Sequence, residues 1–122
     1  RASDKVVLVG AGVGTTPIRA VLQELPRGAD VVAVLRASTP AELALRDEIV
    51  AEVQERRGRV YELVGPREDI DVSAAGLQRL APDLAGRDVF ICGPDGFTRS
   101  VVAAAEDAGV PSAQIHHETF DF

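Results

Sequence analysis

Residues 6–17 read VVLVGAGVGTTP: four consecutive large apolar residues, then three alternating glycines, then Thr15, Thr16 and Pro17. A continuous apolar run of this kind is typical of a strand buried on both faces of a parallel sheet. Pro17 falls where the first turn of a helix should be, a position that proline favours. Glycines at such a junction allow a tight turn and let a phosphate approach the backbone, where free N–H groups and the helix dipole face it. The stretch therefore predicts a strand, an anion-binding turn and a helix.

The glycine pattern differs from two familiar phosphate loops. In a GxGxxG pattern counted from Gly10 the sixth residue is glycine, but here it is Thr15. A Walker A loop requires a following Gly-Lys-Ser/Thr, which this sequence does not have. A tight turn that binds nothing is the alternative interpretation, yet alternating glycines followed by Thr-Thr-Pro are hard to explain by packing alone.

The rest of the chain alternates apolar runs with helical patterns. Further apolar runs cover residues 31–35, 60–64 and 89–92, with a short fifth candidate at 114–117. Helices are predicted over 17–25, from 39 to Gly58, over 73–84 and from 95 to 109. Thr39 and Glu42 form a predicted capping box, and Ser73 and Asp95 are the predicted caps of the third and fourth helices. This alternation predicts one α/β domain, residues 1–122, with a parallel sheet covered on both faces.

The composition excludes several function classes. The formal net charge is −6 and the pI is about 4.8, so nucleic acid and anionic lipid are not expected partners. A single cysteine, Cys92, excludes an internal disulfide and a multi-cysteine metal site. His116 and His117 are neighbours on a predicted strand and point to opposite faces, so we expect no metal there.

No apolar run approaches the ~20 residues that a membrane-spanning helix needs, and no signal peptide is visible. The chain opens with Arg1 and enters a strand almost at once. We therefore expect one domain of a longer protein, on the cytoplasmic side, whether or not the parent protein is attached to a membrane.

Three motifs, in order along the chain, carry a family resemblance. They are Gly12-Val13-Gly14-Thr15-Thr16-Pro17, Cys92-Gly93-Pro94-Asp95-Gly96-Phe97 and the tail His117-Glu118-Thr119-Phe120-Asp121-Phe122. Together they resemble the nucleotide-binding half of the ferredoxin–NADP reductase superfamily over the whole chain. Residues 35–40 and 63–67 look most like ferric-reductase-type and oxygenase-reductase-type members.

The resemblance implies a Rossmann-like, doubly wound sheet of five parallel strands in the order 3-2-1-4-5. It also implies a flavin-binding barrel earlier in the parent protein, which is absent from this chain. The implied function is to position NAD(P)H for hydride transfer to FAD or FMN, from which single electrons pass onward. Without its barrel, the isolated domain is expected to be inactive.

The resemblance also assigns roles to individual residues. The pyrophosphate would be lined by Gly10, Gly12, Val13, Gly14 and Thr15, and Thr16 would lie near the nicotinamide ribose or the flavin edge. The nicotinamide would lie on Cys92, Gly93 and Pro94, followed by Asp95 and by Phe97, where the family often has Met. Cys92 and Glu118 are the expected catalytic residues, and Phe120 or Phe122 would cover the flavin. The alternatives are a purely structural buried thiol at Cys92 and a tail that only packs on the core.

Coenzyme choice depends on the ends of the second and third strands. Dehydrogenases that select NAD usually carry an acidic residue after the second strand, but Arg36 and Ser38 occupy that place here. Arginine and hydroxyl groups suit a 2′-phosphate, and Arg67 resembles the arginine that binds it in NADP-dependent relatives. NADPH is thus the expected coenzyme, with NADH possible. The alternatives are that Arg36 pairs with Glu42 or Asp47 and that Arg67 is only a solvated loop residue.

Other functions remain open at this point. A regulatory or non-catalytic nucleotide-binding domain would keep the same fold without turnover. A receiver-like signalling domain is disfavoured because Gly10 and Gly12 stand where it needs acidic residues. A simple dehydrogenase would need a catalytic domain and an acidic ribose partner.

Overall fold

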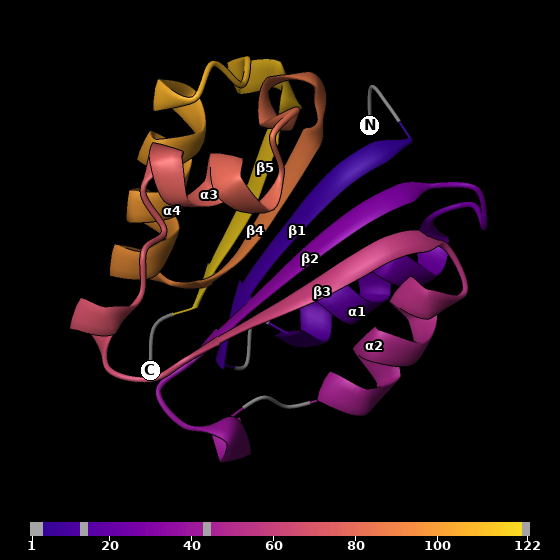
Figure 1. Ribbon diagram of the computed structural model, residues 1–122, viewed down its shortest axis with the longest axis horizontal. Coiled ribbons are helices and arrows are strands. Elements are labelled where there is room, and N and C mark those ends of the chain that lie inside the picture. Colours follow the sequence, from indigo (N-terminus) through magenta and orange to yellow (C-terminus); the bar gives the residue numbers. More distant parts are fainter. Residues whose placement is uncertain (1–3, 13–14, 43–44, 121–122) are drawn as a thin grey trace.

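Five parallel strands form one sheet in the order β3-β2-β1-β4-β5 (Figure 1). The computed structural model describes residues 4–12, 15–42 and 45–120. The strands are β1 (Lys5–Ala11), β2 (Asp30–Ala37), β3 (Arg57–Val64), β4 (Asp88–Pro94) and β5 (Ile115–Phe120). The predicted α/β class and strand order are confirmed. Because all strands run the same way, their carboxyl ends meet at one edge of the sheet, where ligands of such folds bind.

Helices cover both faces of the sheet. The helices α1 (Thr15–Glu24) and α2 (Arg46–Gln54) lie on one face, and α3 (Ala74–Leu80) and α4 (Asp95–Asp107) lie on the other (Figure 1). None of them, within the part of the chain that the structure describes, is long and apolar enough to cross a membrane.

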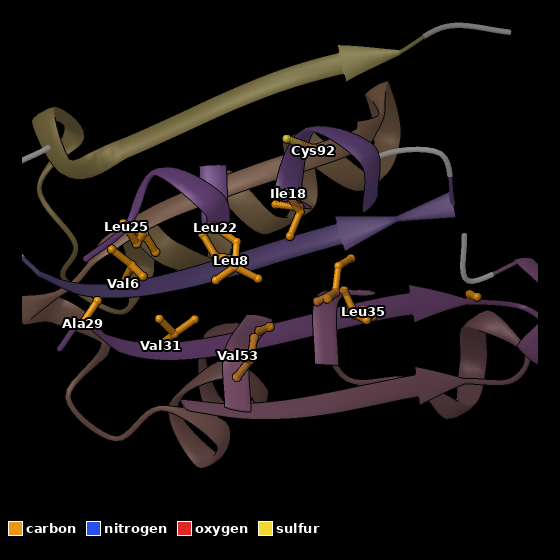
Figure 2. Close-up of a cluster of buried hydrophobic side chains, with 13 residues drawn as sticks. Val6, Leu8, Ile18, Leu22, Leu25, Ala29, Val31, Leu35, Val53 and Cys92 are labelled. Atoms are coloured by element: carbon orange, nitrogen blue, oxygen red, sulfur yellow. The ribbon is translucent and has the colours of Figure 1, made fainter. Parts of the chain in front are cut away.

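Alternate side chains of β1 join two separate cores. Val6 and Leu8 pack in the core beneath α1 and α2, whereas Val7 and Val9 pack beneath α3 and α4. Figure 2 shows the first core, with Ile18 and Leu22 of α1 beside Leu8. Burying each such side chain contributes about 1.5–3 kcal/mol. Packing in the two cores holds the helices against the sheet, and this fixes the positions of the strand ends.

The second helix begins later than predicted. Residues Pro40–Glu42 form a short 3-10 turn, η2, and α2 begins only at Arg46. The capping box is wrong because the Thr39 hydroxyl donates to the Glu42 carboxylate at 3.5 Å instead of capping a helix. Leu43, which the helical pattern included, lies outside the described residues. Gly58, the predicted end of this helix, lies within β3.

The last third of the chain needs three further corrections. Pro94 precedes α4 as its N-cap, and Asp95 is the first helical residue, where its carboxylate pairs with Arg99 at 3.1 Å. Leu84 belongs to a separate 3-10 turn, η4 (Leu84–Gly86), although Ser73 does cap α3 as predicted. The fifth strand runs to Phe120, so Glu118 lies in the sheet rather than in a tail.

Candidate functional site

The glycine turn stands at the centre of the carboxyl edge. Gly10 lies in register with Leu35 of β2 on one side and Cys92 of β4 on the other. Gly12 has a φ of 58°, in the left-handed region that glycine adopts without strain. Thr15 and Thr16 open α1, whereas Val13 and Gly14 lie outside the described residues. The predicted sequence of strand, turn and helix is therefore present.

Cys92 lies between the glycine turn and β5. It is in register with Gly10 and with Glu118, and its residue is only 4% exposed. Burial, followed by the neighbouring Glu118 carboxylate, raises the pKa of the Cys92 thiol to about 11. The thiol is therefore protonated at neutral pH. The structure brings together the two residues that the sequence nominated as catalytic.

A groove of about 300 Å³ opens beside this pair on the α1 face of the sheet. Its walls include Pro17 and Glu24 of α1, together with Cys92, His116 and Glu118. The His116 ring stacks on Phe90 with centroids 4.6 Å apart, and its Nε2 lies 3.4 Å from the buried Asp88 carboxylate. Within residues 4–12, 15–42 and 45–120, no three His, Cys, Asp or Glu side chains are grouped to hold a metal ion.

A second pocket, of about 400 Å³, lies on the α4 side of the same edge. Arg36 from the end of β2 and Arg67 from the 3-10 turn η3 (Arg67–Asp69) line it together with Phe97. The Arg36 guanidinium donates to the carbonyls of Ala37 and, at 3.4 Å, Leu63. No hydrogen bond or ion pair joins the Arg36 guanidinium to Glu42 or Asp47. The alternative that Arg36 pairs with one of these carboxylates is therefore wrong.

Arg67 is exposed, and its guanidinium has no hydrogen bond or ion pair with the residues that the structure describes. Gly96, quoted in the second motif, also lines the pocket, together with three residues that the sequence analysis missed, namely Ile70, Val72 and Ser100. Their only signal was position, since they follow the ends of β3 and β4. Two arginines and one aromatic ring around a cavity suit a ligand with both an anionic group and a flat ring.

The turn from β4 into α4 is tightly packed. A Cβ added at Gly93 would lie 2.8 Å from a ring carbon of Phe97 and 3.3 Å from the Ala11 Cβ. The buried Thr98 hydroxyl donates to the Gly93 carbonyl at 3.1 Å. Sequence reasoning missed Thr98, since nothing in its neighbourhood marks a hydroxyl that bonds five residues back. Phe97 thus touches the turn that follows Cys92 and also lines the arginine pocket.

Several nominated residues line neither of these two cavities, among them Ser38 and Asp95. Ser38 is exposed, and its backbone N–H donates to the Glu42 carboxylate at 3.3 Å. Asp95 lines a separate hollow between α4 and β5. Phe122 lies outside the described residues.

Comparison with known proteins fits this geometry. The family model of the oxidoreductase NAD-binding domain matches residues 8–103, which include the glycine turn, Cys92 and both pocket arginines. The chain is an oxidoreductase NAD-binding domain. This domain is 36% identical to a flavohemoprotein of Pseudomonas aeruginosa, a match that covers 98% of the chain and 33% of that protein. It is 35% identical to the ferredoxin reductase component of a 3-ketosteroid-9-alpha-monooxygenase of Mycolicibacterium smegmatis, over 93% of the chain and 33% of that component.

Among solved structures, the NAD-binding domain resembles the flavohem-like FAD/NAD binding domain of a nitric oxide dioxygenase from Vibrio cholerae. The TM-score is 0.78 at 28% identity, over 98% of this chain and 52% of that one. The chain spans about a third of the length of the curated relatives that it matches. The family predicted from the three motifs is confirmed.

Proposed function

We propose that this domain binds NADPH across the carboxyl edge of its sheet and presents the nicotinamide to a flavin, FAD or FMN, held by another domain of the same parent chain. The observation that carries the proposal is the meeting of three features at that edge: the glycine turn, the Cys92–Glu118 pair and the pocket of Arg36 and Arg67. When bound, the coenzyme supplies the hydride, and the flavin converts the electron pair into single electrons.

The glycine turn is suited to the pyrophosphate. The left-handed backbone at Gly12 turns the chain from β1 toward α1. With Gly10, Val13, Gly14 and Thr15 it would offer backbone N–H groups and the positive end of the α1 dipole to the phosphates. These devices need no lysine or arginine, which suits a chain of net charge −6.

The groove beside Cys92 is suited to the nicotinamide. A thiol whose pKa lies near 11 stays neutral, so it would offer the ring a small, polarizable and uncharged surface. Gly93 and Pro94 follow Cys92 at the end of β4, Thr16 lies in the first turn of α1, and Glu118, in register with Cys92, brings a carboxylate to the same groove. Cys92 and Glu118 would orient the reacting ring without themselves exchanging a proton.

The second pocket is suited to the adenosine end. Arg67 lines the pocket, and its guanidinium has no hydrogen bond or ion pair among the described residues; Arg36 lines the same pocket and donates to two carbonyls. Each shielded arginine contact with a 2′-phosphate contributes roughly 1.5–3 kcal/mol. Phe97 provides an apolar wall at the same pocket.

Calorimetric titration of the 122-residue chain with 2′-phospho-AMP and with AMP tests this assignment. We expect tighter binding of 2′-phospho-AMP, and we expect Arg67→Ala to weaken it about ten-fold while leaving AMP nearly unchanged. Arg27→Ala is the matched control, because Arg27 is an exposed arginine after α1, at the opposite edge of the sheet. Equal or tighter binding of AMP by the unmodified chain would overturn the NADPH assignment and leave NADH.

A non-catalytic role predicts the same nucleotide binding but no turnover. Adding the flavin-binding part of the parent protein to the domain separates the two functions. Flavin reduction by NADPH that requires this domain, and that falls in the Cys92→Ala and Glu118→Gln variants, supports the reductase. Nucleotide binding without flavin reduction would support a regulatory domain.

A further inference from the structure

Thr98 carries a buried hydroxyl close to the carboxyl end of β4. The residue is only 2% exposed, and its hydroxyl donates to the Gly93 carbonyl at 3.1 Å. Among the described residues, the other buried polar or charged ones are Arg87 and Asp88, where β4 begins. The other buried residues of α4 are all valine or alanine. Burial alone therefore does not require a hydroxyl at this place.

The turn that Thr98 bonds has few restraints of its own. Gly93 has no side chain, and Pro94 has no backbone N–H to donate. The register of β4 with β1 ends at Cys92, so beyond this residue only β5 pairs with the strand. The Thr98 hydrogen bond therefore ties the end of β4 to α4 where the sheet holds it on one side only.

We infer that Thr98 is a positioning residue for hydride transfer, because its hydroxyl holds the Gly93–Pro94 turn on which the nicotinamide would lie. The inference rests on the proposed function and deepens it. Since Thr98 is buried, it acts through the Gly93 carbonyl rather than by touching the coenzyme. The hydride passes with its two electrons from the nicotinamide, which is oxidised, to the flavin, which is reduced. The Thr98 hydroxyl keeps its proton throughout.

The rate of such a transfer depends steeply on how the ring is placed. A displacement of about 1 Å can slow a reaction about 100-fold, even when its cause lies outside the reacting groups. Without the Thr98 hydroxyl, the Gly93 carbonyl loses a buried partner and the turn is free to shift. Arg36 is held by other contacts, with the carbonyls of Ala37 and Leu63. The adenosine end should therefore bind as before.

The first test measures flavin reduction by NADPH in the parent protein, with its flavin-binding part present. Thr98→Val removes the hydroxyl and keeps the shape of the side chain. We expect it to slow flavin reduction at saturating NADPH about ten-fold, with the KM for NADPH and the affinity for 2′-phospho-AMP unchanged. Thr98→Ser keeps the hydroxyl and should restore most of the rate.

Val101→Ala is the matched control, because it truncates another buried residue of α4. It should lower the stability of the fold but not the rate of flavin reduction. The inference is overturned if Thr98→Val reduces its flavin as fast as the unmodified protein. Equal losses in Thr98→Val and Thr98→Ser, or an equal loss in Val101→Ala, would overturn it as well.

A second measurement needs neither coenzyme nor flavin. In the isotope-labelled chain, the carbonyl carbon resonance of Gly93 reports on the hydrogen bond directly. We expect it to move in Thr98→Val and to stay in place in Thr98→Ser, and an unchanged resonance in Thr98→Val contradicts the inference. If the resonance moves but the unmodified parent protein does not reduce its flavin, the proposed function itself is refuted. If the unmodified protein is active and Thr98→Val is equally active, only the role of Thr98 is refuted.

Discussion

Cys92 shows how position decides the chemistry of a single residue. Its thiol lies on the α1 face of the sheet, within the first core, and also borders the groove beside Glu118. The buried structural thiol and the ligand-facing thiol, which were alternatives in the sequence, are therefore compatible. Burial keeps the group neutral, and the neutral form is the one that a hydride donor can approach without an added charge.

The ionisation of Cys92 is directly measurable because the chain has no other cysteine. We expect alkylation by iodoacetamide to rise with pH toward a midpoint near 11, since burial and then the Glu118 carboxylate raise the pKa. In Glu118→Gln the midpoint should fall, because the neighbouring negative charge is gone. Glu24→Gln, which removes another carboxylate of the same groove, is the control. A midpoint at the ordinary value of 9.0, or no change in Glu118→Gln, would contradict the assignment.

Among the secondary-structure elements, the junction of β4 and α4 links the two cavities. Phe97 is in the first turn of α4, packs on Gly93 and lines the arginine pocket, while Thr98 bonds the Gly93 carbonyl. The helix α4 therefore packs against the end of β4, where we propose that the nicotinamide binds, and also borders the second pocket.

Two glycines of this junction should respond in opposite ways to the same substitution. Gly93→Ala is expected to destabilise the fold by about 1–3 kcal/mol, because its Cβ meets Phe97 at 2.8 Å and Ala11 at 3.3 Å. Gly96→Ala, in the first turn of α4 with open space around it, is expected to stabilise by up to about 1 kcal/mol. Urea unfolding measures both. Phe97→Leu should partly rescue Gly93→Ala, and equal effects of the two alanines would refute the packing argument.

Strands were easier to predict than helix ends, for a physical reason. The runs at 6–9, 31–35 and 89–92 are apolar because they are buried on both faces. Each residue of such a run therefore indicates a buried strand by its own apolar side chain. The start of α2 depends instead on which groups Ser38 and Thr39 bond to. Both donate to the Glu42 carboxylate, and Thr39 does not cap a helix. Local sequence does not rank such competing hydrogen bonds. The motifs located Cys92 and Glu118, whereas Thr98 and Ile70 could be placed only by the packing of α4 and η3.

At the scale of the whole molecule, a cluster of charged contacts around Arg87 lies at the amino end of the sheet, opposite the end where we propose that the nucleotide binds. Arg87, with a side chain only 3% exposed, donates to the Val6 and Asp30 carbonyls at 3.1 and 3.0 Å. It also pairs with the Asp30 and Asp83 carboxylates at 3.0 and 2.7 Å. These contacts join the amino ends of β1, β2 and β4, far along the strands from the glycine turn. Substitutions there should change unfolding while leaving nucleotide affinity intact.

Acid should weaken the contacts of Arg87 at the amino end of the sheet. Arg87, and then Lys5, lower the pKa of Asp83 from 3.8 to about 2, so the folded state holds the charged form more strongly than the unfolded chain does. The resulting stability is fully present above about pH 4 and is lost as the pH falls toward 2. Because the Asp83 side chain is 42% exposed, solvent keeps the effect modest. In thermal unfolding, Asp83→Asn should lower Tm at pH 7 and flatten its decline between pH 5 and 2. Asp107→Asn, which changes an exposed aspartate at the end of α4, is the control and should leave the decline of Tm with pH unchanged. If Tm falls as steeply in Asp83→Asn as in the unmodified chain, the Arg87–Asp83 pair does not govern stability in acid.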